Sequence, residues 1–420
     1  MNLPPARGAA PGAPRQTGPL ASIAAVAGFA ELGFATVIPL LPLYLKEHLG
    51  ASVTLIGLVV ATFAAVDTSL KTVWGSVADR VGRRPVIVGG LLVASAAPFL
   101  MALIRVPALF VPLRLIDGAG SAAVWPCAAA AIAERAGATR RAAGMGTLNM
   151  FFLTGLALGP SLGLFVAGAF GNYRAGFYLA GVLLLAAAGA ASVVFRGDRA
   201  PYGVAPGAPS DRGAVTPGMS PSAMIAAVRS SPVLPAMLSV AFVQMFGVGL
   251  LAPILVIYAH EVVRLSEQML GVVFLVLVLA VAAASVPGGR LADRVGRPRT
   301  VAWGMAMASA GMWLLPAAGR GNVIVLGVAA VLLGASYAIS SPAWLALMSE
   351  AAPPGRTGLV MGASETAQGA GLIIGPVLGG LFYDRLGPGA PFVASAVLLT
   401  LGTALAVVTL RRRPRAVAAG

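Results

Sequence analysis

Six charged residues interrupt the long apolar runs of this sequence, and their types could do chemistry: Glu31, Asp67, Lys71, Arg114, Asp117 and Glu365. A charge inside a bilayer is costly and usually faces a cavity or a partner. Asp67 and Lys71 stand four residues apart and can pair on one helix face. Arg114 and Asp117 stand three apart and can do the same. Proton transfer is the chemistry that such buried carboxyl groups support.

Glu31 is our first choice for the proton carrier. Burial favours the protonated form of a carboxyl group, and a nearby cation opposes it. Glu31 has no charged neighbour on its own predicted helix, so it is preferred over Asp67, which is second. We expect Asp117 to be held by Arg114. This pair either takes part in proton transfer or has a static structural role.

Twelve apolar runs must position these charges. Each has roughly 20 residues or more, enough for a helix to cross a hydrocarbon core of about 30 Å. The runs are Leu20–Leu45, Val53–Val77, Val86–Ile104, Ala108–Ile132, Ala142–Ala169, Ala175–Phe195, Val233–Ala259, Met269–Leu291, Thr300–Ala317, Asn322–Met348, Thr357–Tyr383 and Ala390–Leu410.

The composition excludes most other classes of protein. Of 420 residues, 58% are hydrophobic and only 10% are charged, against about 25% charged in an ordinary soluble domain. The single cysteine permits no intramolecular disulfide. Neither histidine has a metal-binding spacing, and we find no nucleophile–base pair. The sequence therefore predicts no metal, no cofactor and no enzyme.

Polar segments divide the chain into parts. Residues 1–19 predict a disordered tail, and a Pro-rich stretch at 197–232 predicts a linker. The linker separates a six-helix bundle at 20–196 from a second one at 233–410. A basic tail follows at 411–420.

The basic residues of the loops predict the orientation. Of the 29 Lys and Arg residues, 21 fall in the tails and loops on the side of the N-terminus and six on the opposite side. Positive charge gathers on the cytoplasmic side of a membrane, so we expect both termini in the cytoplasm and the protein in the inner (plasma) membrane. The net charge of +15 then follows from the orientation in the membrane. Membrane lipid rather than nucleic acid is the expected neighbour.

The two halves of the chain repeat one another. The segment from Gly75 to Arg83 matches the segment from Gly289 to Arg297 at an offset of 214, and Glu134 matches Glu350 at an offset of 216. A parallel repeat places the substrate site near the midplane between the halves. The counterparts of Glu31, Asp67 and Asp117 are apolar (Met245, Val281 and Leu333), so the proton chemistry is predicted in the first half alone.

These motifs resemble those of the major facilitator superfamily, over nearly the whole chain. The segment from Gly75 to Arg84 resembles the signature between helices 2 and 3. Arg114-x-x-Asp117-Gly118 resembles the helix 4 proton-transfer motif, although Gln is frequent where Asp117 stands. Gly155-x-x-x-Gly159-Pro160-x-x-Gly163 resembles the helix 5 motif of drug:proton antiporters. The resemblance implies an all-α integral membrane protein with twelve transmembrane helices in two pseudo-symmetric six-helix bundles.

The loop between helices 2 and 3 is predicted to be a conformational latch. Its members are Gly75, Asp79, Arg80, Gly82, Arg83 and Glu134, with Asp293 from the second copy. The Asp79 carboxylate can hold the N-terminus of a facing helix or an arginine. A contact made in only one conformation stabilises that state. The alternative is a topology anchor that merely holds arginines on one side.

The helix-packing motif is predicted to bring helices close together. It consists of Gly155, Gly159, Pro160, Gly163, Gly375 and Pro376. Small residues one turn apart let backbones approach, and the prolines allow bending. Permanent packing and a moving hinge need the same glycines, so the sequence leaves both open.

Aromatic and polar side chains predict the substrate site. The resemblance implies a cavity lined by helices 1, 4, 7 and 10. The candidates are Phe34, Trp125, Gln244, Phe246, Tyr337 and Trp344, with Glu365 from helix 11. Such a lining suits small amphipathic compounds, with Glu31 attracting a cation. For several of these residues the alternative is lipid contact or plain packing.

Three functions follow from these predictions. The first is a monomeric secondary transporter that exports lipophilic or cationic drugs and metabolites in exchange for protons, by alternating access. The second is a flippase for a lipid or glycolipid on the same scaffold. The third is a nutrient importer, which would need more Asn, Gln and Asp along the cavity than this sequence offers.

Overall fold

The computed structural model describes residues 20–196, 234–317, 322–352 and 357–411. The predicted N-terminal tail, the predicted linker and residues 412–420 of the predicted C-terminal tail lie outside these ranges. Within them, the secondary structure is helical. The elements are α1 (Leu20–Leu43), η1 (Tyr44–His48), α2 (Val53–Val81), α3 (Arg83–Leu103), η2 (Pro107–Leu109), α4 (Phe110–Ser121), α5 (Val124–Phe170), α6 (Tyr173–Val194), α8 (Leu234–Leu251), α9 (Ile254–Glu261), α10 (Glu267–Val295), α11 (Arg297–Leu314), η3 (Leu315–Ala317), α12 (Val323–Ala351), α13 (Thr357–Leu386) and α14 (Ala390–Arg411).

Helices lie at all twelve predicted spans, although α11, at the ninth, is not among the segments that are long and apolar enough to cross a membrane. Ten of the described helical segments are long and apolar enough to cross a membrane, and Glu267–Val281 is a shorter apolar stretch. The fourth predicted span is interrupted at Ala122 and Ala123, and the seventh between α8 and α9.

The backbone of α5 contains two limbs, where the sequence predicts two helices joined by a loop. A Cβ on Gly144 would lie 2.8 Å from Cγ2 of Ile132, twelve residues earlier. Twelve residues of straight helix would span about 18 Å. The helix therefore folds back between these positions, and its limbs are the end of the fourth span and the whole of the fifth.

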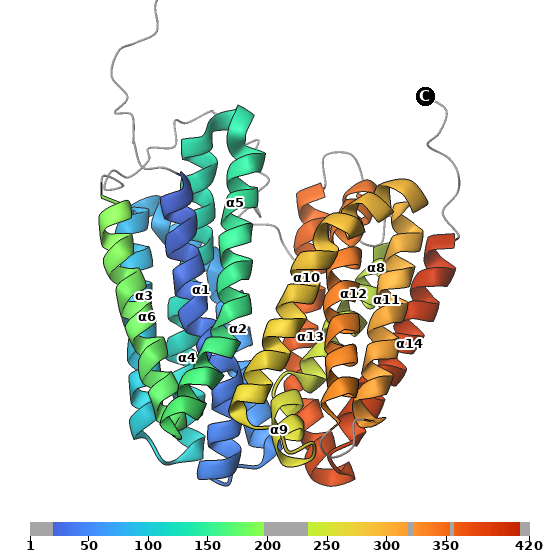
Figure 1. Ribbon diagram of the computed structural model, residues 1–420. Coiled ribbons are helices and arrows are strands. Elements are labelled where there is room, and N and C mark those ends of the chain that lie inside the picture. Colours follow the sequence, from blue (N-terminus) through green and yellow to red (C-terminus); the bar gives the residue numbers. More distant parts are fainter. Residues whose placement is uncertain (1–19, 197–233, 318–321, 353–356, 412–420) are drawn as a thin grey trace, which may run out of the picture.

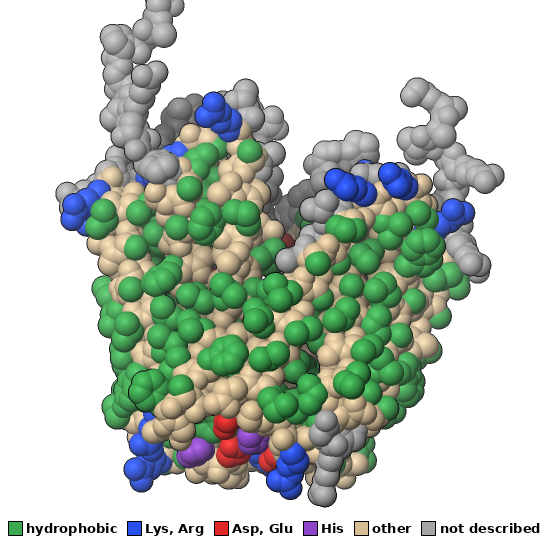
Figure 2. All heavy atoms as spheres, in the orientation of Figure 1, with side chains coloured by type: hydrophobic (Ala, Val, Ile, Leu, Met, Phe, Trp, Pro, Cys, Tyr) green, Lys and Arg blue, Asp and Glu red, His purple; other side chains and the backbone are tan. Residues whose placement is uncertain are grey.

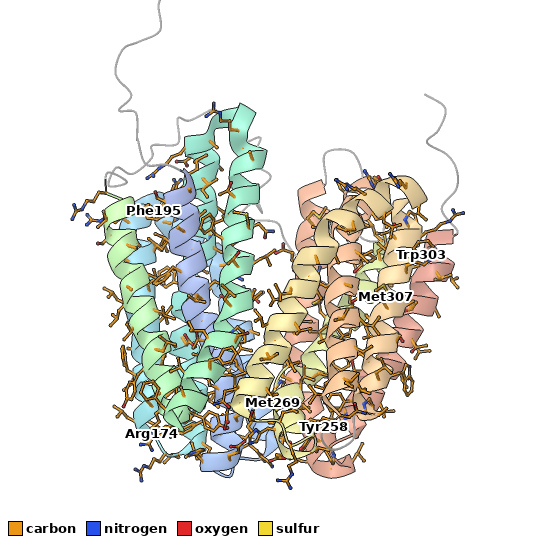
Figure 3. The ribbon with its side chains drawn as sticks, viewed as in Figure 1. Arg174, Phe195, Tyr258, Met269, Trp303 and Met307 are labelled. Carbon is orange, nitrogen blue, oxygen red and sulfur yellow. The ribbon has the colours of Figure 1, made fainter. Side chains whose placement is uncertain are left out.

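The helices form two side-by-side bundles, α1 to α6 and α8 to α14 (Figure 1). We call the end where α1 begins and α14 ends the termini face, and the opposite end the distal face. Phe195 and Trp303 lie toward the termini face, and Arg174, Tyr258 and Met269 toward the distal face (Figure 3). Hydrophobic side chains cover the middle of the surface, and charged ones gather at both ends (Figure 2).

The bundles meet toward the distal face. A Cβ on Gly57 of α2 would lie 2.0 Å from the Pro376 carbonyl oxygen of α13. The hydroxyl of Ser161 on α5 donates to the Gly271 carbonyl of α10 at 2.9 Å. Gly57 and Gly271 stand at the repeat offset of 214, so the two seams are equivalent. At the termini face the surface is instead hollowed between the bundles (Figure 2).

Candidate functional site

Charged groups of the first bundle gather between α2 and α4. Nζ of Lys71 lies 2.6 Å from Oδ2 of Asp67, and the Ser121 hydroxyl donates to Oδ1 of Asp67 at 2.9 Å. One turn away, Arg114 is paired with Asp117. The structure thus forms both pairs that the sequence spacing predicts, and Asp67 joins two helices.

The Arg114–Asp117 pair is buried inside the bundle. Its residues are 6% and 1% exposed, and the guanidinium carbon of Arg114 lies 4.1 Å from the centroid of the Phe63 ring. Within the described residues, Nε of Arg114 and Oδ1 of Asp117 have no hydrogen-bond partner. Buried polar atoms are rarely left unbonded. The pair can therefore still donate a hydrogen bond from Nε of Arg114 and accept one at Oδ1 of Asp117.

Glu31 lies on α1 at the crossing with α5. A Cβ on Gly155 would lie 3.1 Å from Cβ of Glu31 and 2.1 Å from the Gly28 carbonyl oxygen. The Glu31 carboxylate is within electrostatic reach of Asp67 and Lys71. It is not hydrogen-bonded or paired to any other residue in the described ranges. The predicted first-choice carrier thus stands beside the Asp67–Lys71 pair without being neutralised by it.

The glycines of the helix-packing motif face the first helix of their own bundle. Besides Gly155, a Cβ on Gly159 would lie 2.5 Å from Cβ of Ala35, and one on Gly163 would lie 2.7 Å from the Thr36 carbonyl oxygen. In the second bundle, Gly375 and Gly379 meet the backbone of α8 in the same way. The motif therefore holds helices within a bundle, while the Pro376 carbonyl faces across the seam.

The predicted substrate residues have different surroundings. Phe34 is buried and packs on Phe63. Trp125 packs edge-on against Phe152, with centroids 4.9 Å apart. Phe246 stacks on Phe242, with ring centroids 5.5 Å apart. Gln244, on the same helix, is half-buried.

The remaining candidates are split between exposed and core positions. Tyr337 is 47% exposed, and Glu365 is exposed on α13. Trp344 is 7% exposed and packs in the apolar core of the second bundle with Met348 and Leu347. We therefore leave Trp344 out of the proposed substrate wall, because a core side chain does not line an open cavity.

The predicted latch residues lie at the termini face. Arg83, which is buried, pairs with Glu134, and its repeat counterpart Arg297 pairs with Glu350. Asp79 and Arg80 are exposed at the end of α2. The side chain of Asp293 lies outside what the structure describes.

A one-residue turn joins the helices at each copy of this loop. Gly82 has φ +93° and Gly296 has φ +94°. Only glycine adopts such a φ without strain. These positions fix the sharp turns from α2 to α3 and from α10 to α11. Gly75 lies about two turns earlier on α2, and a Cβ there would contact only the Pro126 side chain, at 3.8 Å.

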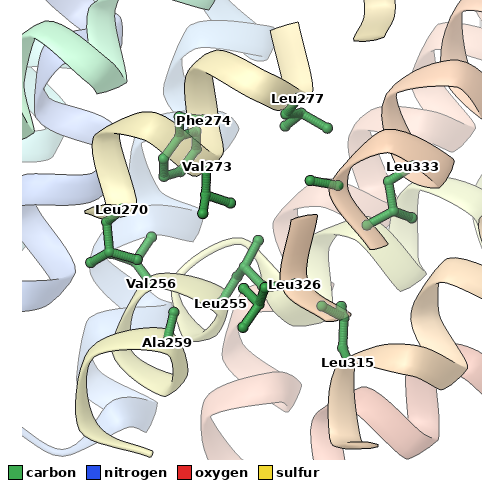
Figure 4. A pocket seen from close by; sticks show the side chains of 11 residues that line it. Leu255, Val256, Ala259, Leu270, Val273, Phe274, Leu277, Leu315, Leu326 and Leu333 are labelled. Atoms are coloured by element: carbon green, nitrogen blue, oxygen red, sulfur yellow. The ribbon is translucent and has the colours of Figure 1, made fainter. Parts of the chain in front are cut away.

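The second bundle has an apolar cavity where the first has charge. A Cβ on Gly118 would meet Phe63, Val66 and Asp67, and one on Gly334 would meet Leu277, Ala280 and Val281, the same positions at the repeat offset. This register aligns Ala330 with Arg114 and Leu277 with Phe63. Ala330 and Leu277 line a cavity of about 40 Å³ with Leu333, Leu326, Leu255 and six other apolar side chains (Figure 4).

A polar network at the distal face was not predicted from the sequence. The Tyr173 hydroxyl lies 3.0 Å from Glu47 and 3.1 Å from Glu267, and Nε2 of His260 lies 3.2 Å from Glu47. Glu47 and Tyr173 belong to the first bundle, and the other two to the second. The sequence shows the acidic loop residues, but no local spacing relates groups that lie 94 or more residues apart.

A second polar contact lies on the same face. Oδ2 of Asp384 on α13 accepts a hydrogen bond from the Thr54 backbone N–H at 2.8 Å and one from the Thr54 hydroxyl at 2.7 Å. Oδ1 accepts from the Val53 N–H at 3.1 Å. A carboxylate at a helix N-terminus is favourable, so Asp384 caps α2 across the seam and closes the distal face.

Two side-by-side bundles of apolar helices, a hollow between them at the termini face (Figure 2) and charges buried in the first bundle are features of a membrane transporter. The chain belongs to the major facilitator superfamily, whose family model matches residues 23–243 and 237–419. It is therefore a multi-pass membrane transport protein and not an enzyme.

Two of the relatives are drug-resistance proteins by name. The chain is 25% identical over 393 residues to the multidrug resistance protein 2 of Bacillus subtilis, covering 93% of this chain and 94% of that one. It is 33% identical over 152 residues to the quinolone resistance protein NorA of Staphylococcus aureus, covering 36% of this chain and 38% of that one.

Solved structures share the fold. The nucleoside transporter NupG superposes with a TM-score of 0.75 at 11% identity, over 94% of this chain and 98% of that one. A bacterial homologue of the human lysosomal transporter Spinster gives a TM-score of 0.75 at 16% identity, over 95% and 98% of the two chains.

Proposed function

We propose that this protein exports lipophilic or cationic small molecules in exchange for protons, with both termini in the cytoplasm. The observation that carries the proposal is the placement of charge. The central acidic groups Glu31, Asp67 and Asp117 lie in the first bundle, and the second bundle has apolar residues and a cavity at the matching positions. A drug with a cationic and an apolar end matches such a divided site. The similarity to a multidrug resistance protein supports the same substrate class.

The closed distal face and the hollowed termini face support access from the side of the termini. A compound would enter from the cytoplasm, between the bundles, and reach Glu31 beside Phe34 and Phe63. Proton release from a carboxyl group there would let the carboxylate attract a cation. Rocking of the bundles would then open the seams at Gly57 and Gly271 to the outside.

Export is tested by growth of a pump-deficient bacterial host that expresses the protein. We expect raised inhibitory concentrations for several amphipathic cations, and loss of that protection when the proton gradient is collapsed. Unchanged inhibitory concentrations over a panel of cationic and neutral compounds, with the protein present in the membrane, would contradict export.

A lipid flippase is the second candidate, because the same division between a charged first bundle and an apolar second bundle suits a lipid's head group and chains. Fluorescent phospholipid and glycolipid analogues in vesicles containing the protein separate the two functions. Export predicts no acceleration of lipid movement between leaflets above that of protein-free vesicles.

A further inference from the structure

We propose that Lys71 changes partners during transport, from Asp67 in the state described here to Glu365 when the termini face closes. Lys71 is then a positioning residue that couples the movement of the bundles to the proton site. The proposal rests on alternating access in the proposed function. It names a contact that this conformation does not contain.

The seam between α2 and α13 sets the register. Toward the distal face, a Cβ on Gly380 would lie 2.4 Å from the Val53 carbonyl oxygen, and one on Gly57 would lie 2.0 Å from that of Pro376. Toward the termini face, a Cβ on Gly369 would lie 3.3 Å from Cγ2 of Thr68. Of these three distances from a built Cβ to the facing helix, the one at Gly369 and Thr68 is the longest. The two helices therefore diverge toward the termini face.

Lys71 and Glu365 lie one turn beyond that point, on facing helices. Helix α2 runs toward the termini face, and Lys71 follows Thr68 by three residues. Helix α13 runs away from that face, and Glu365 precedes Gly369 by four residues. Three or four residues of helix advance about 5–6 Å. Closing the wedge brings the two residues to the same level across the seam.

Their present surroundings leave both able to move. The Lys71 side chain is 43% exposed although its ammonium is bound to Asp67. Glu365 is exposed and has no ion-pair or hydrogen-bond partner within the described ranges. Burying a carboxylate without a partner is strongly unfavourable, and a lysine ammonium on its flexible stem can be shared. Closure therefore favours Lys71 meeting Glu365.

The exchange would change the proton site directly. Asp67 faces Lys71 on its own helix, Ser121 from α4 and, more distantly, Glu31 from α1 and the Arg114–Asp117 pair. When Lys71 leaves, Asp67 keeps Ser121 and loses its closest cation. The exchange therefore removes a positive charge from beside the predicted proton site when the termini face closes.

Cross-linking tests the proximity. In a Cys127→Ala background, the pair Lys71→Cys and Glu365→Cys is compared with the control pair Val73→Cys and Glu365→Cys, because Val73 is 50% exposed on another face of α2. We expect a short bifunctional thiol reagent to join the first pair about tenfold faster, since proximity sets the rate. Equal rates for the two pairs would overturn the proposal.

A double-mutant cycle tests the coupling through transport. Lys71→Gln and Glu365→Gln should each lower the transport rate. The double variant should transport no more slowly than the slower single variant. Glu365→Asp, which keeps the carboxylate, should transport faster than Glu365→Gln. Losses that simply multiply would overturn the exchange. If the unaltered protein exports no compound but the cross-link forms selectively, the export function fails and the partner exchange stands.

Discussion

At the scale of single residues, the charge of this protein is distributed unequally between two halves of similar sequence. The first bundle holds Glu31, two ion pairs and the Ser121 bridge, and the second holds Val281, Ala330 and Leu333 at the equivalent places. Keeping charges at membrane depth is costly. Of the six charges in the predicted spans, Glu365 alone lies in the second bundle, which supports the proposal that the first bundle binds the proton.

Glu31 is the residue on which proton exchange is expected to depend. Because its carboxylate is held by no cation, Glu31→Gln should abolish substrate-driven proton release, whereas Glu31→Asp, which keeps the carboxyl group, should retain part of it. The measurement is proton release from purified protein on addition of a transported compound. Full release by both Glu31→Gln and Asp67→Asn would place the carrier elsewhere.

At the scale of helices, the glycines separate contacts within a bundle from contacts between bundles. Gly155, Gly159 and Gly163 pack α5 on α1, and Gly375 and Gly379 pack α13 on α8. Gly57 and Gly271 lie in the seams instead. Substitutions at the two groups should therefore affect different properties.

Gly155→Ala tests the contact within the first bundle. Its Cβ would lie 2.1 Å from the Gly28 carbonyl oxygen, so α5 must move away from α1, at a cost of about 1–3 kcal/mol. We expect a lower midpoint of thermal unfolding in detergent. Gly189→Ala is the control, because a Cβ there meets nothing within 4 Å. Equal midpoints for the two variants would contradict the assignment.

The α2–α3 loop gives a second prediction at this scale. Asp79 is exposed at the open termini face, as a latch would be when released. Asp79→Asn should slow transport several-fold while leaving the amount of protein in the membrane unchanged. Normal transport by a fully inserted variant would leave the loop as a topology anchor.

At the scale of the whole molecule, the distal face is closed by groups drawn from both bundles. Glu47, Tyr173, His260 and Glu267 connect them, and Asp384 caps α2. In the proposed transport cycle, these contacts break when the distal face opens. Their strength therefore contributes to the equilibrium between the two states.

Gly57→Ala should shift that equilibrium. The added Cβ would lie 2.0 Å from the Pro376 carbonyl oxygen only while the distal face is closed. We expect faster labelling of Ser161→Cys, at a position that is buried in the α5–α10 seam, in a Cys127→Ala background, by a membrane-impermeant maleimide. Gly89→Ala, which meets nothing within 4 Å, is the control. A labelling rate unchanged from the control would refute a closed-state clash.

The sequence predicts the spans and the repeat because a bilayer imposes length and apolarity on every helix. It also predicts the two ion pairs, since i,i+3 and i,i+4 spacing is a local property. The fold-back inside α5, the core position of Trp344 and the Tyr173 network could not be predicted in this way. Each depends on which face of a helix meets a distant neighbour, and uniformly apolar helices carry little pattern to show it.

The cavity beside Ala330 also has a mechanical consequence. Hydrostatic pressure favours states without voids, and about 40 Å³ of empty space is present in the second bundle where the first is filled by Arg114. Pressure should therefore draw the side chains around this cavity closer together. The equivalent place in the first bundle, where the Arg114 guanidinium lies over the Phe63 ring, should compress less.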